Sequence, residues 1–195
     1  DMGAVAPGYK ADLAVFDDLR TLNVKQVYKG GKLVAENGKM LHQKEKNTDW
    51  STEIKERVFH SFHRVPITVE ELQLKETTGT HQRVIDMVAH ELITKERIEE
   101  WKELPGVAPG VDISRDIVKL AAIERHKNTG HVGLGFLGKY GLKKGAVATS
   151  IGHDSHNLVI AGVTDEDMVL AGNRVIENGG GLAIALEGKV LADLP

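Results

Sequence analysis

Cysteine is absent from the 195 residues of this chain. Disulfide frameworks, zinc sites built on thiolates and a cysteine nucleophile are therefore excluded. The lack of disulfides fits a reducing compartment, and the first residues lack the basic and apolar regions of a signal peptide. We therefore expect a soluble, cytoplasmic protein.

Long apolar runs and an excess of basic residues are also missing. No window approaches the roughly 18 apolar residues that a membrane helix needs. Lys and Arg total 25 against 28 Asp and Glu, a formal net charge of −3, which argues against binding a membrane or a nucleic acid through bulk charge. Proline is scarce at 5 residues, whereas the 21 glycines exceed the roughly 14 of an average composition. The glycines therefore indicate tight turns and bulges.

Three stretches of the chain differ in character. Residues 1–42 read as short strands, and Gly30-Gly31 between two apolar runs predicts a hairpin because both turn positions tolerate a positive φ. Residues 43–63 are polar and charged, and we interpret them as a linker followed by a short helix over Thr52–Phe59. Residues 64–195 alternate apolar runs with glycine and are expected to form a second domain.

The second domain is predicted to be α+β, with a mixed, largely antiparallel sheet and packed helices. Its best-supported helix follows Thr164, which with Asp167 forms an acidic variant of the capping box, and ends at Asn178-Gly179. The apolar face of this helix is expected to comprise Met168, Ala171, Gly172, Val175 and Ile176. The expected strands are Gln82–Val88, Ile117–Ile123, His131–Leu137, Gly145–Ile151, Asn157–Val163, Leu182–Leu186 and Lys189–Ala192.

Three weaker patterns raise the question of a ligand. Gly133–Gly138 matches G-x-G-x-x-G, but phosphate binding needs a helix to open there, and the glycines that follow favour a strand and loop instead. His60 and His63 would share a face on a helix, with no further metal ligand near them in sequence. Glu124–His131 is a polar cluster that turn chemistry explains in part, while its charged and imidazole side chains could reach a cleft.

The stretch His153-Asp154-Ser155-His156-Asn157 is the main candidate site. Five consecutive polar side chains, two of them imidazoles, lie between two apolar runs, where an ordinary turn needs only Gly, Asn or Asp. Two histidines beside an aspartate can exchange protons, ligate a metal or hydrogen-bond a heterocycle. Adjacent residues rarely converge on one point, so Asp154, Ser155 and His156 do not make a hydrolytic triad by themselves.

The same stretch carries a family resemblance. Ala146–Gly162, centred on the His-Asp-Ser-His-Asn run, resembles the C-terminal domain of bacterial and archaeal adenine deaminases. Pro7–Leu13 resembles the strand that closes the small β-sandwich of amidohydrolase-superfamily enzymes, and Asn23–Asn37 resembles the hairpin after it. The glycine-containing segments Thr129-Gly130, Gly133–Phe136 and Gly179–Gly181 fit the same family, so the resemblance spans nearly the whole chain.

The resemblance implies an enzyme that hydrolyses adenine to hypoxanthine and ammonia. In that family a (β/α)₈ barrel carries two divalent metals, manganese or iron, which activate the attacking water. Such a barrel needs about 250 residues and cannot fit here. The chain is therefore expected to be a fragment, inactive alone, whose metal centre lies in the missing barrel. Adenine, water, the remaining polypeptide and a second copy in a homo-oligomer are the implied partners.

The resemblance also assigns the domains and the site. It makes residues 1–42 the last strands of the composite β-sandwich and residues 64–195 an adenine deaminase C-terminal domain, incomplete at its own C-terminus. His153 and His156 are the candidates for a proton relay, and Asp154, Ser155 and Asn157 the candidates for binding the purine. Three alternatives remain: the histidines hold an interdomain contact, they bind an auxiliary metal, or the chain is a non-catalytic module for assembly or purine binding.

Overall fold

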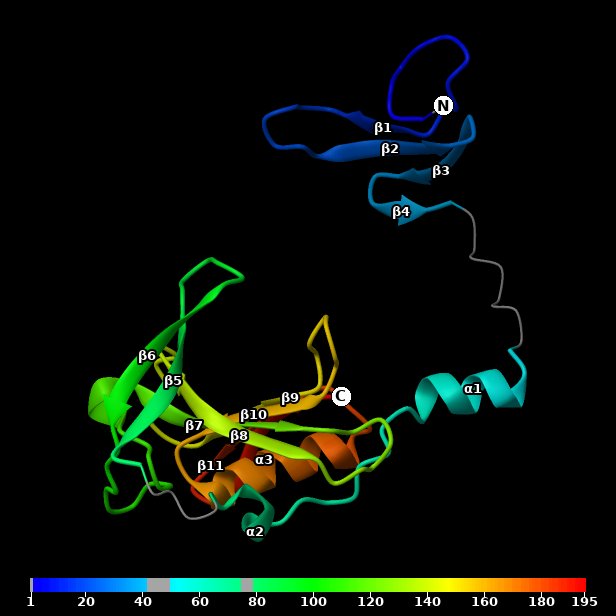
Figure 1. Cartoon of the computed structure of the whole chain (residues 1–195). Coiled ribbons are helices and arrows are strands. Elements are labelled where there is room, and N and C mark those ends of the chain that lie inside the picture. Colours follow the sequence, from blue (N-terminus) through cyan, green and yellow to red (C-terminus); the bar gives the residue numbers. More distant parts are fainter. Residues whose placement is uncertain (1, 42–49, 75–78) are drawn as a thin grey trace. The chain divides into compact units, whose positions relative to one another are not determined.

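The computed structural model describes residues 2–41, 50–74 and 79–195. The chain separates into two compact units, Asp1–Ser51 and Thr52–Pro195 (Figure 1). Most of the stretch interpreted as a linker lies outside the described residues. The helix predicted after it is present as α1 (Thr52–Phe59), with the predicted bounds.

The first unit is a four-stranded antiparallel sheet in the order β1-β2-β3-β4. Its strands are β1 (Leu13–Phe16), β2 (Val24–Lys29), β3 (Lys32–Glu36) and β4 (Lys39–Met40). The predicted hairpin at Gly30-Gly31 is confirmed, with φ of 56° and 77° at the two glycines. None of the described residues 2–41 is buried. This small sheet therefore has no core of its own.

The second unit is built around an eight-stranded sheet in the order β12-β11-β9-β10-β7-β8-β5-β6. Neighbouring strands are antiparallel except β5 and β8, which run parallel. Besides α1, its elements are α2 (Val69–Leu72), β5 (His81–Met87), β6 (Thr94–Glu100), the 3₁₀ helix η1 (Ile113–Arg115), β7 (Ile117–Ile123), β8 (Val132–Gly138), β9 (Ala146–Thr149), β10 (Leu158–Gly162), α3 (Asp165–Glu177), β11 (Leu182–Leu186) and β12 (Lys189–Leu194). The predicted α+β class with a mixed, largely antiparallel sheet is confirmed.

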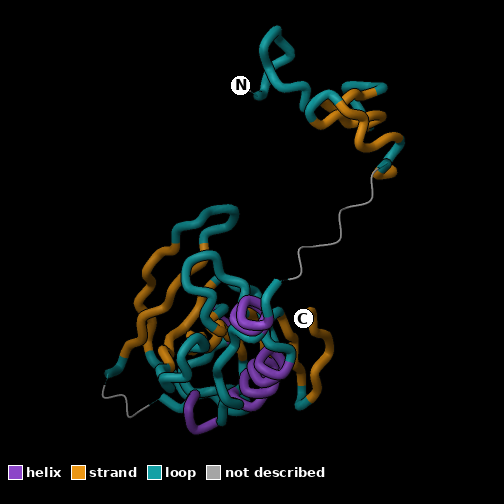
Figure 2. Tube along the Cα trace, turned by 90° about the vertical axis from the view of Figure 1, so that its right-hand side faces the viewer, coloured by secondary structure: helices purple, strands orange, loops and turns teal. Residues whose placement is uncertain are grey.

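Helix α3 covers one face of this sheet. Thr164 is its N-cap and accepts a hydrogen bond from the Asp167 N–H, as the capping pattern predicts. The helix packs on β9, β10, β11 and β12, and Figure 2 shows strands on both sides of it, so the sheet curves around α3. The core between them contains the expected helical face, and Ile176 packs at its edge. Burial of these aliphatic side chains is the main stabilising term for the unit.

One charged pair lies inside this core. The side chain of Lys119 on β7 is fully buried, and its Nζ lies 2.7 Å from Oδ1 of Asp165 in the first turn of α3. A buried ammonium needs a charged partner, so this pair holds the start of the helix against the centre of the sheet.

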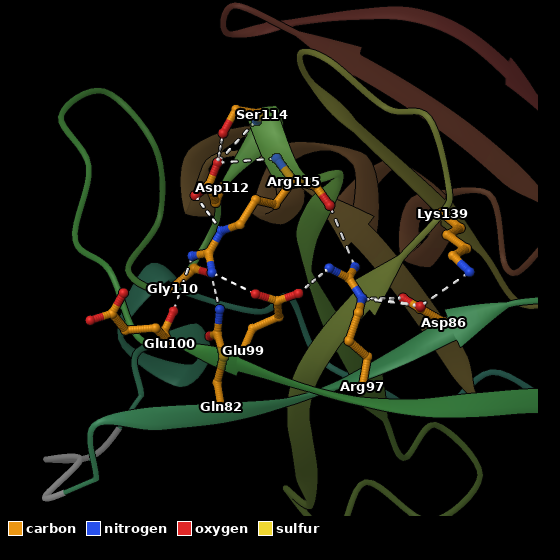
Figure 3. A network of polar contacts seen from close by, with 10 residues as sticks. All are labelled: Gln82, Asp86, Arg97, Glu99, Glu100, Gly110, Asp112, Ser114, Arg115 and Lys139. Carbon is orange, nitrogen blue, oxygen red and sulfur yellow. Dashed lines mark hydrogen bonds and ion pairs between the residues drawn. The ribbon is translucent and has the colours of Figure 1, made fainter.

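Strand β6 was missed by the sequence reasoning because five of its seven residues are Lys, Glu or Arg. It pairs along its whole length with β5 at the edge of the sheet. The structure explains its composition through a network of ion pairs (Figure 3). The single N–H at Nε of Arg97 donates a bifurcated hydrogen bond to the two carboxylate oxygens of Asp86 on β5, at 2.9 and 3.0 Å. Glu99 then bridges Arg97 and Arg115, at 2.6 and 2.7 Å.

The network ends at a buried carboxylate. Arg115 donates from Nε to Asp112 at 2.7 Å, and Asp112 also caps η1 by accepting the backbone N–H groups of Ser114 and Arg115. The network therefore ties the charged edge strand to the segment that leads into β7. Among the described residues, no helix has the length and apolar character needed to cross a membrane.

Candidate functional site

The predicted site lies in the turn between β9 and β10, here called the histidine turn (residues 151–157). Its polar side chains point into solvent: His153 and Asp154 are 80% and 92% exposed, and Nδ1 of His153 lies 2.8 Å from Oδ1 of Asp154. Ser155 and His156 are also exposed, and Asn157 is half-buried. The turn therefore presents two imidazoles and a carboxylate together, at an accessible edge of the domain.

The backbone of the histidine turn is closed on itself. The N–H of His156 donates to the carbonyl of Gly152 at 2.9 Å, and His156 adopts a left-handed conformation with φ of 49°. A non-glycine residue in this region costs roughly 1–2 kcal/mol. Glycine would therefore fit this position more easily than histidine.

The neighbouring turn between β7 and β8 holds the histidine turn from one side. Arg125 donates from Nε to the carbonyl of His156, and the ring nitrogen Nε2 of His126 lies 2.7 Å from the carbonyl of Ser155. The Arg125 guanidinium also stacks over the ring of Phe62 at 4.9 Å and donates to the carbonyl of Ser61. The contacts of Arg125 and His126 with the histidine turn engage its backbone carbonyls. The side chains of His153 and Asp154 remain exposed.

Glu124 organises that supporting turn. Its carboxylate accepts hydrogen bonds from the backbone N–H groups of His126, Lys127 and Thr129, at 2.6 to 2.9 Å, and from the Thr129 hydroxyl. These donors, led by the Thr129 N–H, lower the pKa of Glu124 to about 2. The carboxylate is thus engaged within its own turn, beside the imidazole and guanidinium that contact the histidine turn.

The structure also brings together two histidine patterns that are separate in sequence. A surface hollow of about 480 Å³ is lined by residues including His60, His63 and His126. His60 and His63 do not share a helical face, because α1 ends at Phe59, as predicted, and both residues lie in the segment after it. Nε2 of His60 lies 3.8 Å from Glu56, one turn back on α1.

The glycine pattern Gly133–Gly138 lies within strand β8, and no helix opens after it. The interpretation of a glycine-punctuated strand is confirmed. One of these glycines has a packing role, since a Cβ on Gly138 would overlap with the carboxylate of Asp86 and the guanidinium of Arg97. The pattern therefore permits the close approach of a side-chain ion pair.

Metal ligands do not converge in the part of the chain that the structure describes. There, no group of three or more His, Asp or Glu side chains is placed to hold a metal ion. The two histidines and the aspartate of the histidine turn do not by themselves fit a metal pair. Their geometry suits hydrogen bonding and proton exchange with a polar ligand.

Sequence reasoning found the histidine turn but not the residues that support it. Arg125 was considered only as part of a polar cluster, and Phe62 was not considered. The signal was indirect: a charged pair, Glu124-Arg125, follows a strand whose residues are apolar except for Lys119. Which turn it would meet depends on β10 pairing with β7, which the sequence alone does not reveal.

An open mixed sheet, covered by helices on one face and carrying an exposed polar turn at the ends of two central strands, defines an α+β domain. The sequence model of the family "Adenine deaminase C-terminal domain" matches residues 91–195. The chain belongs to this family.

Proteins named adenine deaminase align with the whole chain. They include those of Lysinibacillus sphaericus (41% identical, 100% of this chain and 32% of that protein) and Kosmotoga olearia (42%, 100% and 32%). Adenine deaminase 2 of Carboxydothermus hydrogenoformans is 41% identical, over 100% of this chain and 33% of that protein. The chain thus spans about a third of the length of the curated relatives it matches.

Proposed function

We propose that this chain is the C-terminal portion of an enzyme that hydrolyses adenine to hypoxanthine and ammonia. The support is the family membership together with the alignment of the whole chain to a third of several adenine deaminases. The catalytic barrel, with its manganese or iron pair, would belong to the remaining polypeptide. The 195 residues alone are expected to be inactive, and the parent enzyme to be cytoplasmic and homo-oligomeric.

Within that enzyme, the histidine turn completes the purine pocket. This proposal is supported by the different roles of backbone and side chains in the turn. Arg125 and His126 hold its carbonyls, while the side chains of His153 and Asp154 face solvent. Imidazole, carboxylate and amide groups can pair with purine ring nitrogens and the exocyclic amine. A site that uses such paired polar contacts discriminates strongly among bases.

His156 and His153 are the candidates to move protons as ammonia departs. An imidazole titrates near neutral pH and can pass a proton in either direction. Oδ1 of Asp154 lies 2.8 Å from Nδ1 of His153 and favours one orientation of that ring. Ser155 and Asn157 supply a hydroxyl and an amide at the same edge, suited to binding rather than proton transfer.

The test is steady-state adenine deamination by the full-length parent carrying His156→Ala. We expect kcat/KM to fall about a hundredfold, or about 2.7 kcal/mol of transition-state stabilisation, with metal content and folding unchanged. His90→Ala is a matched control, since His90 also lies in an exposed turn with a positive φ of 63°. Equal kinetics for both variants would contradict the assignment.

The second candidate is a non-catalytic module for assembly. It is favoured by the absence of any buried residue in the described part of the first sheet, which therefore needs a cover. The same kinetic experiment separates the two roles. An assembly module would show unchanged kinetics on losing His156, and a changed oligomeric state when its contact surface is altered.

A further inference from the structure

The eight-stranded sheet has a second face, turned away from α3, which is apolar at its centre. Side chains alternate between the two faces of a strand, so the neighbours of the core positions point to this side. Two rows of directly paired residues cross six strands there. One row is Leu194, Leu182, Thr149, Val159, Ala122 and Gly133, and the other is Ala192, Ile184, Val147, Ala161, Leu120 and Gly135. We call these twelve residues the open face.

The open face carries no charged side chain, and its own unit covers it only in part, where Ala161 is buried and packs with Leu120 and Val163 in an apolar cluster. Val147, Val159, Leu182 and Ile184 are only half-buried and take part in none of the three apolar clusters formed by the described residues. A Cβ added to Gly135 would find no atom within 4 Å, so there is open space above that strand. An antiparallel sheet with a solvated face normally alternates apolar with polar residues. The composition of this face therefore predicts a partner.

The place of the open face relates it to the histidine turn. Val147 and Thr149 on β9 and Val159 on β10 belong to the two strands that the histidine turn connects. In Figure 1 the β9–β10 turn and the β5–β6 hairpin both rise from the sheet on the side away from α3. A partner seated on the open face would therefore lie beside the exposed imidazoles.

The size of the open face distinguishes between partners. Six strands at about 4.8 Å spacing and two residue rows give a patch of roughly 24 by 14 Å, or about 300 Å². A free-standing protein complex usually buries about 800 Å² on each partner. A patch this small gives stable contact when the partner is tethered, because the tether raises its effective concentration. The curated relatives are about three times as long as this chain. The rest of such a polypeptide would be a partner that is tethered to the open face.

We propose that the open face is the surface on which the remaining part of the same polypeptide docks. The proposal rests on the proposed function only in taking the chain as part of a longer adenine deaminase. Contact there sets the distance of the histidine turn from the rest of the enzyme. The occupant is expected to offer an uncharged, apolar surface that matches the aliphatic rows.

The test uses single cysteines, since this chain contains none of its own. Ala122→Cys and Val147→Cys place a thiol on the open face of the full-length parent. Leu191→Cys is the control, because Leu191 lies on β12 of the same sheet, is not one of the twelve open-face residues, and has a side chain that is 59% exposed. Labelling by a maleimide is followed site by site by peptide mass spectrometry, after equal folding has been checked by circular dichroism.

We expect both open-face thiols to react at least about tenfold more slowly than the control thiol in the parent, since reactivity follows exposure. In the 195-residue chain Ala122→Cys and Leu191→Cys should react at similar rates. Similar rates in the parent would overturn the proposal. Protection that disappears on dilution, as oligomers dissociate, would also overturn it by assigning the face to a second copy.

This measurement is independent of catalysis. Protected thiols together with unchanged kinetics of His156→Ala would keep the docking surface and remove the histidine turn from the reaction. Reactive thiols together with a large kinetic loss would do the reverse. The two proposals therefore fail separately.

Discussion

The network around Arg97 and the histidine turn are both rich in charged and polar side chains, but they use them in opposite ways. In the network, each guanidinium and carboxylate is bonded to another within the domain. In the histidine turn, Arg125 and His126 hold backbone carbonyls, and the side chains of His153 and Asp154 face solvent. Polar groups bonded to one another stabilise a fold, whereas polar groups displayed on a fixed backbone are available to a ligand.

The largest expected difference concerns Arg97. Among the described residues, Arg97→Ala leaves the almost fully buried carboxylate of Asp86 with Lys139, 3.5 Å away, as its remaining ion-pair partner. We expect a loss of about 3 kcal/mol in unfolding free energy, measured by urea denaturation. Arg83→Ala on β5 removes an exposed partner of Glu96 and should cost less than about 1 kcal/mol. Equal losses would mean that the network adds nothing beyond surface pairing.

A second test adds one methyl group to β8. Gly138→Ala forces the Asp86–Arg97 pair apart, because the new Cβ overlaps both groups, and should cost about 2 kcal/mol. Gly135→Ala lies on the same strand with open space around it. It should change the stability of the 195-residue chain by less than about 0.5 kcal/mol. The measurement is thermal unfolding of both variants. Equal melting temperatures would contradict the packing role of Gly138.

Acid should weaken the network through Asp112. Hydrogen bonding from Ser114 and then the contacts with Arg115 lower the pKa of Asp112 from 3.8 to about 2. A lowered pKa stabilises the folded state above pH 4, and this contribution is lost as the pH falls from about 4 to 2. Asp112→Asn should remove about 2 kcal/mol of that pH dependence. An unchanged slope of unfolding free energy against pH in this window would contradict the assignment.

The smallest effect is expected in the histidine turn. His156→Gly relieves the left-handed backbone and should change stability by no more than about 1 kcal/mol, in the stabilising direction. In the full-length parent the same variant should lose activity as His156→Ala does. A destabilised His156→Gly would show that the imidazole serves the fold, and the contrast between the two regions would fail.

These differences also explain which parts of the fold could be predicted. Strands β7 and β11 were predicted with their full bounds because their residues are apolar, apart from Lys119 on β7. Strand β6 was missed because Arg97 and Glu99 are satisfied by residues distant in sequence, which no local pattern reveals. The helix α2 was missed as well, because its four residues are too few to show helical periodicity. It is held at its start by a hydrogen bond from the Thr68 N–H to the Glu71 carboxylate.

The candidate site was found for a related reason. His153 and His156 stand out in sequence because they have no place in an ordinary turn. Their support by Arg125 and His126 depends on the pairing of β7 with β10, a contact between distant segments. Unusual residues can be recognised locally, whereas the side chains that hold them in place require the structure.

The parallel pairing of β5 with β8 has a consequence for how the chain reaches its fold. β7 and β8 form a local antiparallel pair across one short turn, which the Glu124 carboxylate closes with three backbone hydrogen bonds. In the sequence, β6, η1 and β7 lie between β5 and β8, so the pairing of β5 with β8 closes a much longer loop. Closing long loops is slow, so we expect the β7–β8 hairpin to form early and the β5–β6 hairpin to join last. The edge that carries the ion-pair network is then the slowest part of the domain to assemble.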